Sequence, residues 1–503
     1  MTEISSTSSS GVNISATLTI LLAALLLPLS FTGGVVTTPA ISQDLHGGPL
    51  SLAWLTNGFM LTFGSGLLAA GVAADKLRHK RVFIAGLALF AVSSLLIAST
   101  NGTFTLGIYR ALQGIAAALT LAGGATALAH IYSGAARTRV FSLLGTLFGA
   151  GLALGPLLMG VITDALNWRW VYGLLAAMAA IIGLAGQLSI VSIKTPPSAP
   201  ADIRGTALFS LALLAFTTTL ILLPQYGAGS LTVFIGLAMT LLAGSLFVRH
   251  TQRTRNPVFT LALLRQPHFA GVLLLPVATC YCYVVLLIVI PLFLMGAREL
   301  SETQSAVILL SLTAPMLIFP GIAAWLTRWF NAGKISVAGL LLATLGLIGM
   351  AHAIRTDGLM ALACSMFVTG IGAALPWGLM DGLAVSAVAV ERAGMAAGLF
   401  NTVRVAGEGI ALAIVMALLA LLNRLGLQQN IPTLDIAARD KAAAWLSGSH
   451  VVQAHELLPQ IPAQLLMRNV EQAYFILLYG LAALTFGCAL WVGILLRQPR
   501  KQA

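Results

Sequence analysis

The chain consists of long apolar stretches separated by short polar segments. Fourteen of these stretches are long enough to cross the roughly 30 Å hydrocarbon core of a membrane, which takes about 20 helical residues. They lie near residues 16–36, 53–73, 82–99, 105–131, 140–163, 170–191, 205–223, 230–248, 268–292, 303–327, 335–353, 359–380, 394–421 and 472–496. The pattern predicts an all-α polytopic membrane protein.

Composition agrees with that prediction, because only 8% of the 503 residues are charged and 58% are apolar. So little polar surface excludes a soluble globule of this size. No basic segment precedes the first stretch, and further stretches follow it, so we expect an uncleaved helix there and not a signal peptide. All four cysteines lie within apolar stretches. We therefore expect neither a disulfide framework nor a metal site.

The basic residues behind the net charge of +12 are concentrated on alternate connections between the spans. Eighteen Lys and Arg residues lie at 74–81, 133–139, 192–204, 249–267, 328–334, 381–393 and 497–503, on alternate connections. The opposite short connections hold only Arg169, Arg298 and Arg355. The positive-inside rule then places both termini in the cytoplasm, and we expect the bacterial inner membrane. The basic surplus faces anionic lipid, and no nucleic-acid partner is expected.

An internal repeat divides the chain. The segment GIAAAL at 114–119 returns as GIGAAL at 370–375, and matches at 85–87 and 149–154 return in the same order at nearly the same offset. Two six-helix bundles with two helices inserted between them are the expected architecture. We predict a cytoplasmic tail at 1–15, a bundle at 16–192, a linker with two inserted helices at 193–267, a bundle at 268–497 and a tail at 498–503. The outward loop at 422–471 is either a connector or a lid.

The stretch at 145–160, GTLFGAGLALGPLLMG, contains five glycines and a proline. At about 100° per residue, one helix face holds Gly145, Gly149, Pro156 and Gly160, and the nearly opposite face holds Gly151 and Gly155. Bare backbone on two faces lets two neighbouring helices approach closely, which supplies packing energy in a membrane.

Several motifs resemble those of one transporter family. Gly151-x-x-x-Gly155-Pro156-x-x-Met159-Gly160 resembles the antiporter motif of the major facilitator superfamily, and the segment WRWVY at 168–172 resembles the exit of that helix in the fourteen-span drug:proton antiporters. Further similar segments are residues 71–81, Arg110-x-x-Gln113-Gly114 and Asn401-x-x-Arg404. The resemblance implies two bundles around a central cavity and proton-driven drug export by alternating access. One departure is in the first helix, where Ser30 and Val35 stand at the family's usual Asp and Asn.

The same resemblance implies a conformational latch at the cytoplasmic end of the second helix. A carboxylate there would cap a facing helix, and neighbouring cations would hold the two bundles together. The alternative is a solvated positive-inside loop. The latch residues are Asp75, Lys76, Arg78, Lys80 and Arg81.

Three ionisable residues lie well inside predicted spans: Arg110, Arg404 and Glu408. Each such group costs about 2.5–3.5 kcal/mol or more in the membrane, so it is a functional candidate. Arg404 and Glu408 are four residues apart and could simply neutralise one another. Glu408 replaces Ala150 of the repeat, so it could instead meet Arg110 across the bundles. A carboxyl group that alternates between a cation and none can take up and release a proton.

Polar and aromatic residues in the spans are candidates for contact with a substrate, with packing as the alternative. They are Ser30, Asn57, Gln113, Tyr281, Tyr283, Trp377 and Asn401.

These observations favour a proton-coupled exporter of small amphipathic compounds. A second hypothesis is a carrier for a metabolite or metal chelate such as a siderophore, anionic or zwitterionic, with rearranged or absent proton coupling. No nucleophile constellation or metal cluster indicates an enzyme. We expect a small-molecule substrate, protons and membrane lipids as partners, no cofactor beyond the proton gradient, and a monomer.

Overall fold

A computed structural model describes residues 6–132, 134–191, 202–227, 229–254, 257, 266–356, 358–387 and 393–497. Within these residues the regular secondary structure is entirely helical. Fourteen segments of this part of the chain are long and apolar enough to cross a membrane, which confirms the predicted number.

The helices fall into three groups along the chain. The N-terminal half contains α1 (Ser6–Val36), α2 (Thr38–Leu45), α3 (Pro49–Leu77), α4 (His79–Ser99), α5 (Thr103–Ile131), α6 (Gly134–Ala165) and α7 (Trp168–Ser189). The inserted pair is α8 (Ile203–Tyr226) and α9 (Leu231–Arg253). The C-terminal half contains α11 (Pro267–Thr279), the π-helical turn η1 (Cys280–Val284), α12 (Leu286–Gly296), α13 (Glu302–Thr313), α14 (Pro315–Leu326), α15 (Ala332–Arg355), α16 (Leu359–Ser386), α17 (Ala393–Asn430), α18 (Ile436–Ser447), α19 (Val451–Leu457) and α20 (Ala463–Leu495).

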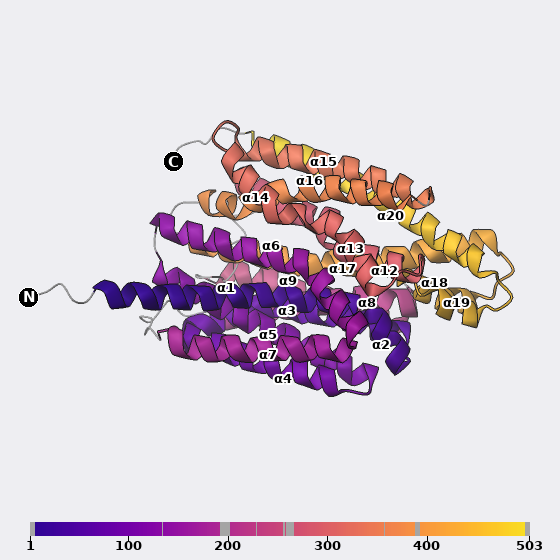
Figure 1. Ribbon diagram of the computed structural model, residues 1–503, viewed down its shortest axis with the longest axis horizontal. Helices are drawn as coiled ribbons and strands as arrows, with labels where there is room; N and C mark the ends of the chain where they lie inside the picture. Colours follow the sequence, from indigo (N-terminus) through magenta and orange to yellow (C-terminus); the bar gives the residue numbers. More distant parts are fainter. Residues whose placement is uncertain are drawn as a thin grey trace, which may run out of the picture.

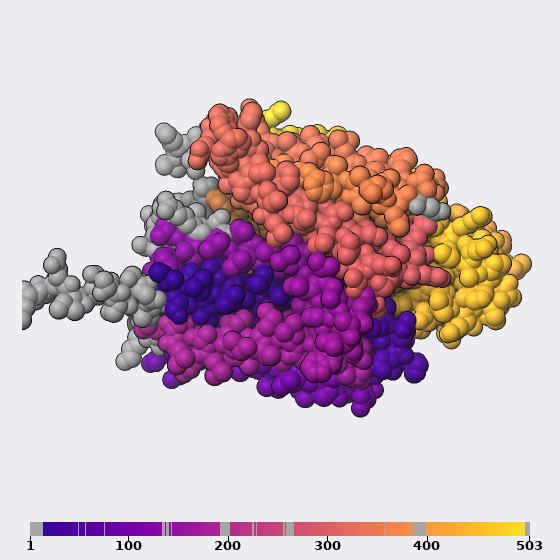
Figure 2. All heavy atoms as spheres, viewed as in Figure 1, coloured from indigo at the N-terminus to yellow at the C-terminus, as the bar shows by residue number. Residues whose placement is uncertain are grey.

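The two halves lie side by side with their long helices roughly parallel (Figure 1). We call the end at which α1 begins and α20 ends the inner end, and the opposite end, where α18 and α19 lie, the outer end. Figure 2 shows the indigo-to-magenta N-terminal half against the orange C-terminal half along the length of the molecule. Helix α8 packs against α3 and α17 and so touches both halves, whereas α9 packs on α8 and is mostly exposed.

The sequence repeat corresponds to repeated helix packing. A Cβ atom at Gly114 of α5 would overlap the backbone carbonyl of Phe59 in α3. A Cβ atom at Gly370 of α16 would overlap the carbonyl of Leu312 in α13 in the same way. The fourth helix of each half therefore crosses the second helix of that half through a bare backbone contact. Shared sequence at 114–119 and 370–375 thus reflects a shared crossing.

One glycine face of α6 packs against α1. A Cβ atom at Gly151 would lie 2.6 Å from the carbonyl oxygen of Leu25, and one at Gly155 would overlap the hydroxyl group of Thr32. The two helices are close enough that only glycine fits between them. This contact lies within the N-terminal half.

The other face of α6 packs against the C-terminal half. A Cβ atom at Gly145 would lie 3.2 Å from the carboxylate of Asp381, and one at Gly160 would lie 3.0 Å from the carbonyl oxygen of Glu302. Pro156 is buried in the same helix between them. Because Gly145 is toward the inner end and Gly160 toward the outer end, α6 follows the interface between the halves for much of its length.

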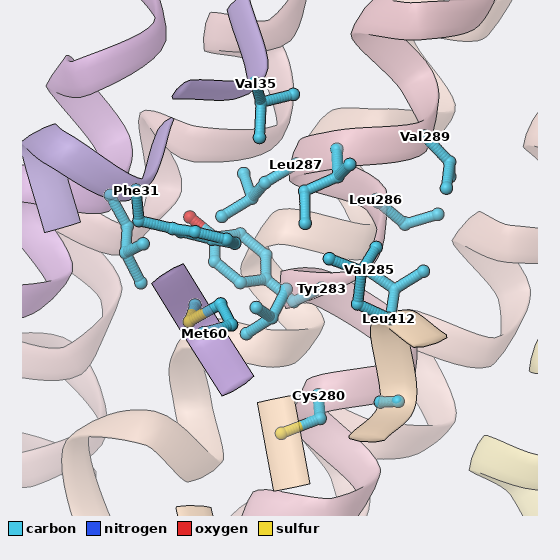
Figure 3. Packing of buried hydrophobic residues seen from close by; sticks show 14 of the residues in the cluster. Phe31, Val35, Met60, Cys280, Tyr283, Val285, Leu286, Leu287, Val289 and Leu412 are labelled. Carbon is cyan, nitrogen blue, oxygen red and sulfur yellow. The ribbon is translucent and has the colours of Figure 1, made fainter. Parts of the chain in front are cut away.

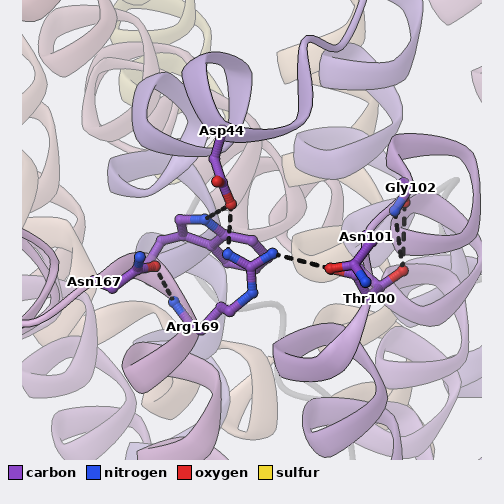
Figure 4. A network of polar contacts seen from close by, with 7 residues as sticks. Asp44, Thr100, Asn101, Gly102, Asn167 and Arg169 are labelled. Atoms are coloured by element: carbon purple, nitrogen blue, oxygen red, sulfur yellow. Dashed lines mark hydrogen bonds and ion pairs between the residues drawn. The ribbon is translucent and has the colours of Figure 1, made fainter.

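A polar network fixes α2 at the outer end (Figure 4). The indole N–H of Trp168 donates to Asp44 at 3.0 Å, and Arg169 forms an ion pair with the same carboxylate. Arg169 also donates to Asn101 at 3.3 Å, in the turn between α4 and α5. The guanidinium of Arg169 holds the pKa of Asp44 below its usual value, so this pair stays ionised at neutral pH. The first residues of the WRWVY segment therefore anchor the outer end of the N-terminal half.

Helices occupy much of the outward loop predicted at 422–471. Helix α17 continues to Asn430 and α20 already begins at Ala463, with α18 and α19 between them. The side-chain amide of Asn469 donates to Asn423 at 2.9 Å, and both residues are buried. This hydrogen bond joins α17 to α20 near the outer end.

We predict that Gly155→Leu enters the membrane but loses transport. The larger side chain would force α1 and α6 apart, and overpacking of this kind costs about 1–3 kcal/mol. The amount of protein in the membrane, the thermal unfolding of the purified protein and its transport rate measure these effects. Gly173→Leu is the matched control, because a Cβ atom at Gly173 meets no atom within 4 Å. Full transport and unchanged unfolding of Gly155→Leu would show that α1 and α6 do not depend on this contact.

Candidate functional site

Arg110 of α5 is fully buried in the N-terminal half. Its Nε donates to the carbonyl oxygen of Leu55 at 3.1 Å, and its Nη1 donates to the Ser30 hydroxyl at 3.2 Å and to Gln113 Oε1 at 2.6 Å. Its guanidinium also lies over the ring of Phe59, 4.7 Å from the centroid. These partners are all neutral and all belong to the N-terminal half, and Nη2 has no partner. The charge is therefore solvated by dipoles and an aromatic face, with the two N–H donors of Nη2 unused.

Arg404 of α17 is paired with an acid. Its side chain is 6% exposed, and Nη1 lies 3.3 Å from Asp381 Oδ2. Its Nη2 donates to Asn401 Oδ1 at 2.6 Å. Asp381 belongs to α16, so the salt bridge joins two helices of the C-terminal half. The Asp381 side chain is 27% exposed and remains within reach of water.

Aromatic rings surround the Arg404 guanidinium. The ring centroids of Phe148, Trp377 and Phe400 lie 5.8, 5.9 and 5.7 Å from its central carbon, within cation–π range. Phe148 comes from α6, so this cluster includes the N-terminal half. Tyr283 meets Trp377 edge-on with centroids 6.0 Å apart. The Tyr283 hydroxyl and the Trp377 indole nitrogen are buried without hydrogen-bond partners.

Glu408 lies at a junction of the two halves. It is 1% exposed, and neither carboxyl oxygen has a hydrogen-bond partner. One turn earlier, the Cys280 thiol of η1 lies 3.8 Å from the carbonyl oxygen of Arg404. On the adjacent residue, a Cβ atom at Gly409 would lie 3.5 Å from Met60 of α3. Figure 3 shows Met60 and Cys280 among the apolar side chains that meet here. The part of α17 that carries Glu408 is thus packed against η1 and α3, and π-helical turns such as η1 are frequent at functional sites.

The predicted substrate-contact residues form two groups, one in each half. Ser30 and Gln113 bind Arg110. Asn401 and Trp377 contact Arg404, and Tyr283 contacts Trp377. Two others stand apart from both groups. Asn57 donates to the Ala53 carbonyl at 3.0 Å while its Oδ1 has no partner, and Tyr281 is partly exposed.

The predicted latch lies where α3 ends and α4 begins. The side chain of Asp75 lies outside the described residues. Lys76 and Arg81 are exposed, and Arg78 has a positive φ of 73° at the turn. Lys80 donates to the carbonyl oxygen of Gln187 at 2.7 Å, which ties α4 to the end of α7 within the N-terminal half. The role of these residues as a latch stays a prediction.

In the structure, Glu408 is hydrogen-bonded neither to Arg404 nor to Arg110, the two partners that the sequence suggested. Arg404 is bound to Asp381 instead, and the guanidinium of Arg110 is held among acceptors of its own half. Asp381 was missed because the apolar pattern ends the span at residue 380, whereas α16 continues to Ser386. One signal was available: Asp381 follows Trp377 by four residues and so extends the same helix face.

Comparisons with known proteins agree with this architecture. A family model described as Major Facilitator Superfamily matches residues 20–412. The chain is 27% identical over 399 residues to the tetracenomycin C resistance and export protein of Streptomyces glaucescens, covering 79% of this chain and 74% of the relative. It is 27% identical over 379 residues to the methylenomycin A resistance protein of Streptomyces coelicolor, covering 75% and 80%. The solved structure of a bacterial homolog to the human lysosomal transporter Spinster, inward-facing and unoccupied, matches with a TM-score of 0.64 at 12% identity over 98% of both chains, a likeness of fold.

We predict that Asp381→Ala destabilises the protein and that the pair Asp381→Ala with Arg404→Met recovers most of the loss. The single change leaves a buried guanidinium without its acid, which costs up to about 3–5 kcal/mol, and the partial exposure of Asp381 reduces that figure. The free energy of unfolding of the purified variants measures both effects.

A surface ion pair provides the control. Arg424 and Asp440 lie 2.8 Å apart with side chains 40% and 37% exposed, so Asp440→Ala should cost less than about 1 kcal/mol. A double variant at 381 and 404 that is as unstable as Asp381→Ala would contradict the pairing.

Proposed function

Because the chain belongs to the Major Facilitator Superfamily, we propose that it exports small amphipathic compounds in exchange for protons. The chain is a multi-pass membrane transporter and not an enzyme. The direction of transport, the coupling to protons and the residues involved are the proposal. It includes a bacterial inner membrane, cytoplasmic termini, a monomer, and the proton gradient as energy source without a further cofactor.

The observation that carries the proposal is the isolation of Glu408. An ionised carboxylate without a hydrogen-bond partner in an apolar enclosure costs several kcal/mol, so this arrangement favours the neutral, protonated group. Glu408 also lies where α17 of one half meets α3 of the other. A movement of the halves relative to one another would therefore change its surroundings.

The proton would leave when a cation reaches Glu408. Arg404 lies one helical turn away and is bound to Asp381 in this structure. In the proposed cycle, Asp381 and Glu408 compete for the same guanidinium. While Asp381 holds it, Glu408 keeps its proton, and when the guanidinium turns to Glu408 the carboxylate is stabilised and the proton is released. Phe148 of the N-terminal half contacts Arg404, so the position of that half would bias the competition.

The cargo would bind near the same groups. The unpartnered Tyr283 hydroxyl and Trp377 indole N–H provide polar contacts beside large aromatic faces, which suits compounds with both polar and apolar parts. The name of the Streptomyces glaucescens relative describes resistance and export. That name supports the outward direction proposed for this chain.

A second function is favoured by Arg110. Its Nη2 is buried without a partner, and its known partners are neutral, so an anionic group could complete its coordination. The chain would then carry an anionic or zwitterionic metabolite or metal chelate, with proton coupling rearranged or absent.

Transport by Glu408→Gln in proteoliposomes tests the proposed coupling. Gln keeps the shape of the side chain but cannot titrate. With one proton per cycle, a gradient of one pH unit supports about a tenfold accumulation, and we expect Glu408→Gln to fall to a ratio of about one. Counterflow exchange of the same labelled compound should continue, because it requires no net proton movement. A panel of cationic, neutral and anionic compounds identifies the cargo class.

Glu456→Gln is the matched control, since Glu456 is exposed at the outer end and should leave accumulation unchanged. Accumulation by Glu408→Gln at the wild-type level would remove Glu408 from the coupling mechanism. Accumulation of anionic compounds alone, without a dependence on the pH gradient, would support the second function.

A further inference from the structure

At the outer end the two halves are joined by a pair of acids. Asp164 lies in the last turn of α6, and Glu302 begins α13. The backbone N–H of Thr303 donates to Asp164 Oδ2 at 2.8 Å. The side chains of Glu302, Ser301 and Thr303 also lie within hydrogen-bond reach of the Asp164 carboxyl group. Gly160, one turn earlier in α6, allows this approach, because a Cβ atom there would lie 3.0 Å from the carbonyl oxygen of Glu302.

A hydrogen bond between two carboxyl groups requires a proton. An ionised carboxylate only accepts hydrogen bonds, so one member of the pair must carry the hydrogen that the other accepts. If both groups ionise, the bond is lost and two negative charges face one another at short range. The pair then titrates as a unit. Loss of the shared proton replaces an attraction between the two side chains by a repulsion, while the N–H group of Thr303 still donates to Asp164, so the contact between the halves is weakened.

Water at the outer end reaches this pair. Asp164 is exposed and Glu302 partly exposed. Glu302 also lines a cavity of about 440 Å³ at the outer end, together with Gln43 of α2, Glu299 and His450. A proton from the outer solution therefore has a direct route to the pair.

Other titratable groups at the outer end include Arg169, Arg298, His450 and Glu299. Arg169 is paired with Asp44 and Arg298 with Glu471. Burial lowers the pKa of His450 to about 4, so His450 stays neutral at the pH values that would ionise the acids. Glu299 is exposed in the same cavity.

We propose that Asp164 and Glu302 form a proton-operated latch: one shared proton holds the outer ends of the two halves together, and its loss lets them separate. The inference rests on the proposed function in one respect only, namely the part that closure of the outer end plays in the transport cycle. In a proton-driven exporter, a proton taken up from outside after cargo release would close the outer end and start the return of the empty carrier. The latch itself operates at any pH that titrates the pair, with or without cargo.

The distance between the outer ends tests the latch directly. Spin labels at Phe104 and Met360, in a variant without the four native cysteines, report it, since these residues begin α5 and α16 and are 79% and 77% exposed. In purified protein without substrate, we expect one short distance at about pH 5 and a growing longer component toward pH 9. The ratio of open to closed forms should rise by up to about tenfold per pH unit, the limit for a single proton.

Three variants separate the latch from other causes. Glu302→Gln replaces the titrating donor by an amide N–H that still donates to Asp164, so the short distance should persist at high pH. Asp164→Ala removes the acceptor, so the longer distance should be present even at low pH. Glu299→Gln, in the same cavity, should respond like the wild type.

The proposal is overturned if the wild-type distance does not change with pH, or if Glu302→Gln responds as the wild type does. If Glu408→Gln abolishes the response and Glu302→Gln does not, the pH dependence belongs to Glu408 and the latch is rejected. If accumulation assays show no proton coupling but the distance still responds through Glu302, the latch stands and the proposed exchange with protons fails.

Discussion

The fold depends on the close approach of helix backbones in a solvent that does not drive helices together. Lipid tails are as apolar as the helices themselves, so association relies on van der Waals contact at short range. Helix α6 provides that contact on two faces. Gly151 and Gly155 admit α1, while Gly145 and Gly160 admit the C-terminal half. The approach of the two halves along α6 therefore follows from where this helix lacks side chains.

The three buried ionisable groups have different surroundings, and the differences indicate which of them can respond to a movement of the halves. Arg110 is surrounded by neutral acceptors of its own half, so movement between the halves leaves its shell intact. Arg404 has an acid, but its aromatic surroundings include Phe148 of the other half. The carboxyl group of Glu408 has no hydrogen-bond partner. The groups that depend on the relative position of the halves are therefore Arg404 and Glu408.

Much of the fold is predictable from the sequence because membrane spans and close contacts have local causes. Length and apolarity predict the fourteen spans, the repeat at 114–119 predicts two bundles, and helical spacing predicts two faces for α6. The pairing of charges is not local. Asp381 and Asp164 lie near helix ends, where hydropathy does not separate a helix residue from a connection, and their partners are distant in the sequence. Hence the sequence identifies which groups are buried but not which groups meet.

The repeat gives the two acid sites a common position. Helices α6 and α17 are the fifth helices of their halves, and each packs across the interface on the second helix of the other half, α13 for α6 and α3 for α17. Asp164 belongs to the first contact and Glu408 to the second.

In a symmetric scaffold the same rocking motion separates one end of such a contact while it closes the other. In the mechanism that we propose, acids at these two contacts would let protons act on the same motion at two depths, Asp164 from the outer solution and Glu408 from within the membrane. The internal repeat is broken at Glu408, because the corresponding residue of the N-terminal half is Ala150. In this mechanism the two repeated halves provide the rocking motion, and the acids that the repeat does not share determine where a proton would favour one position of the halves.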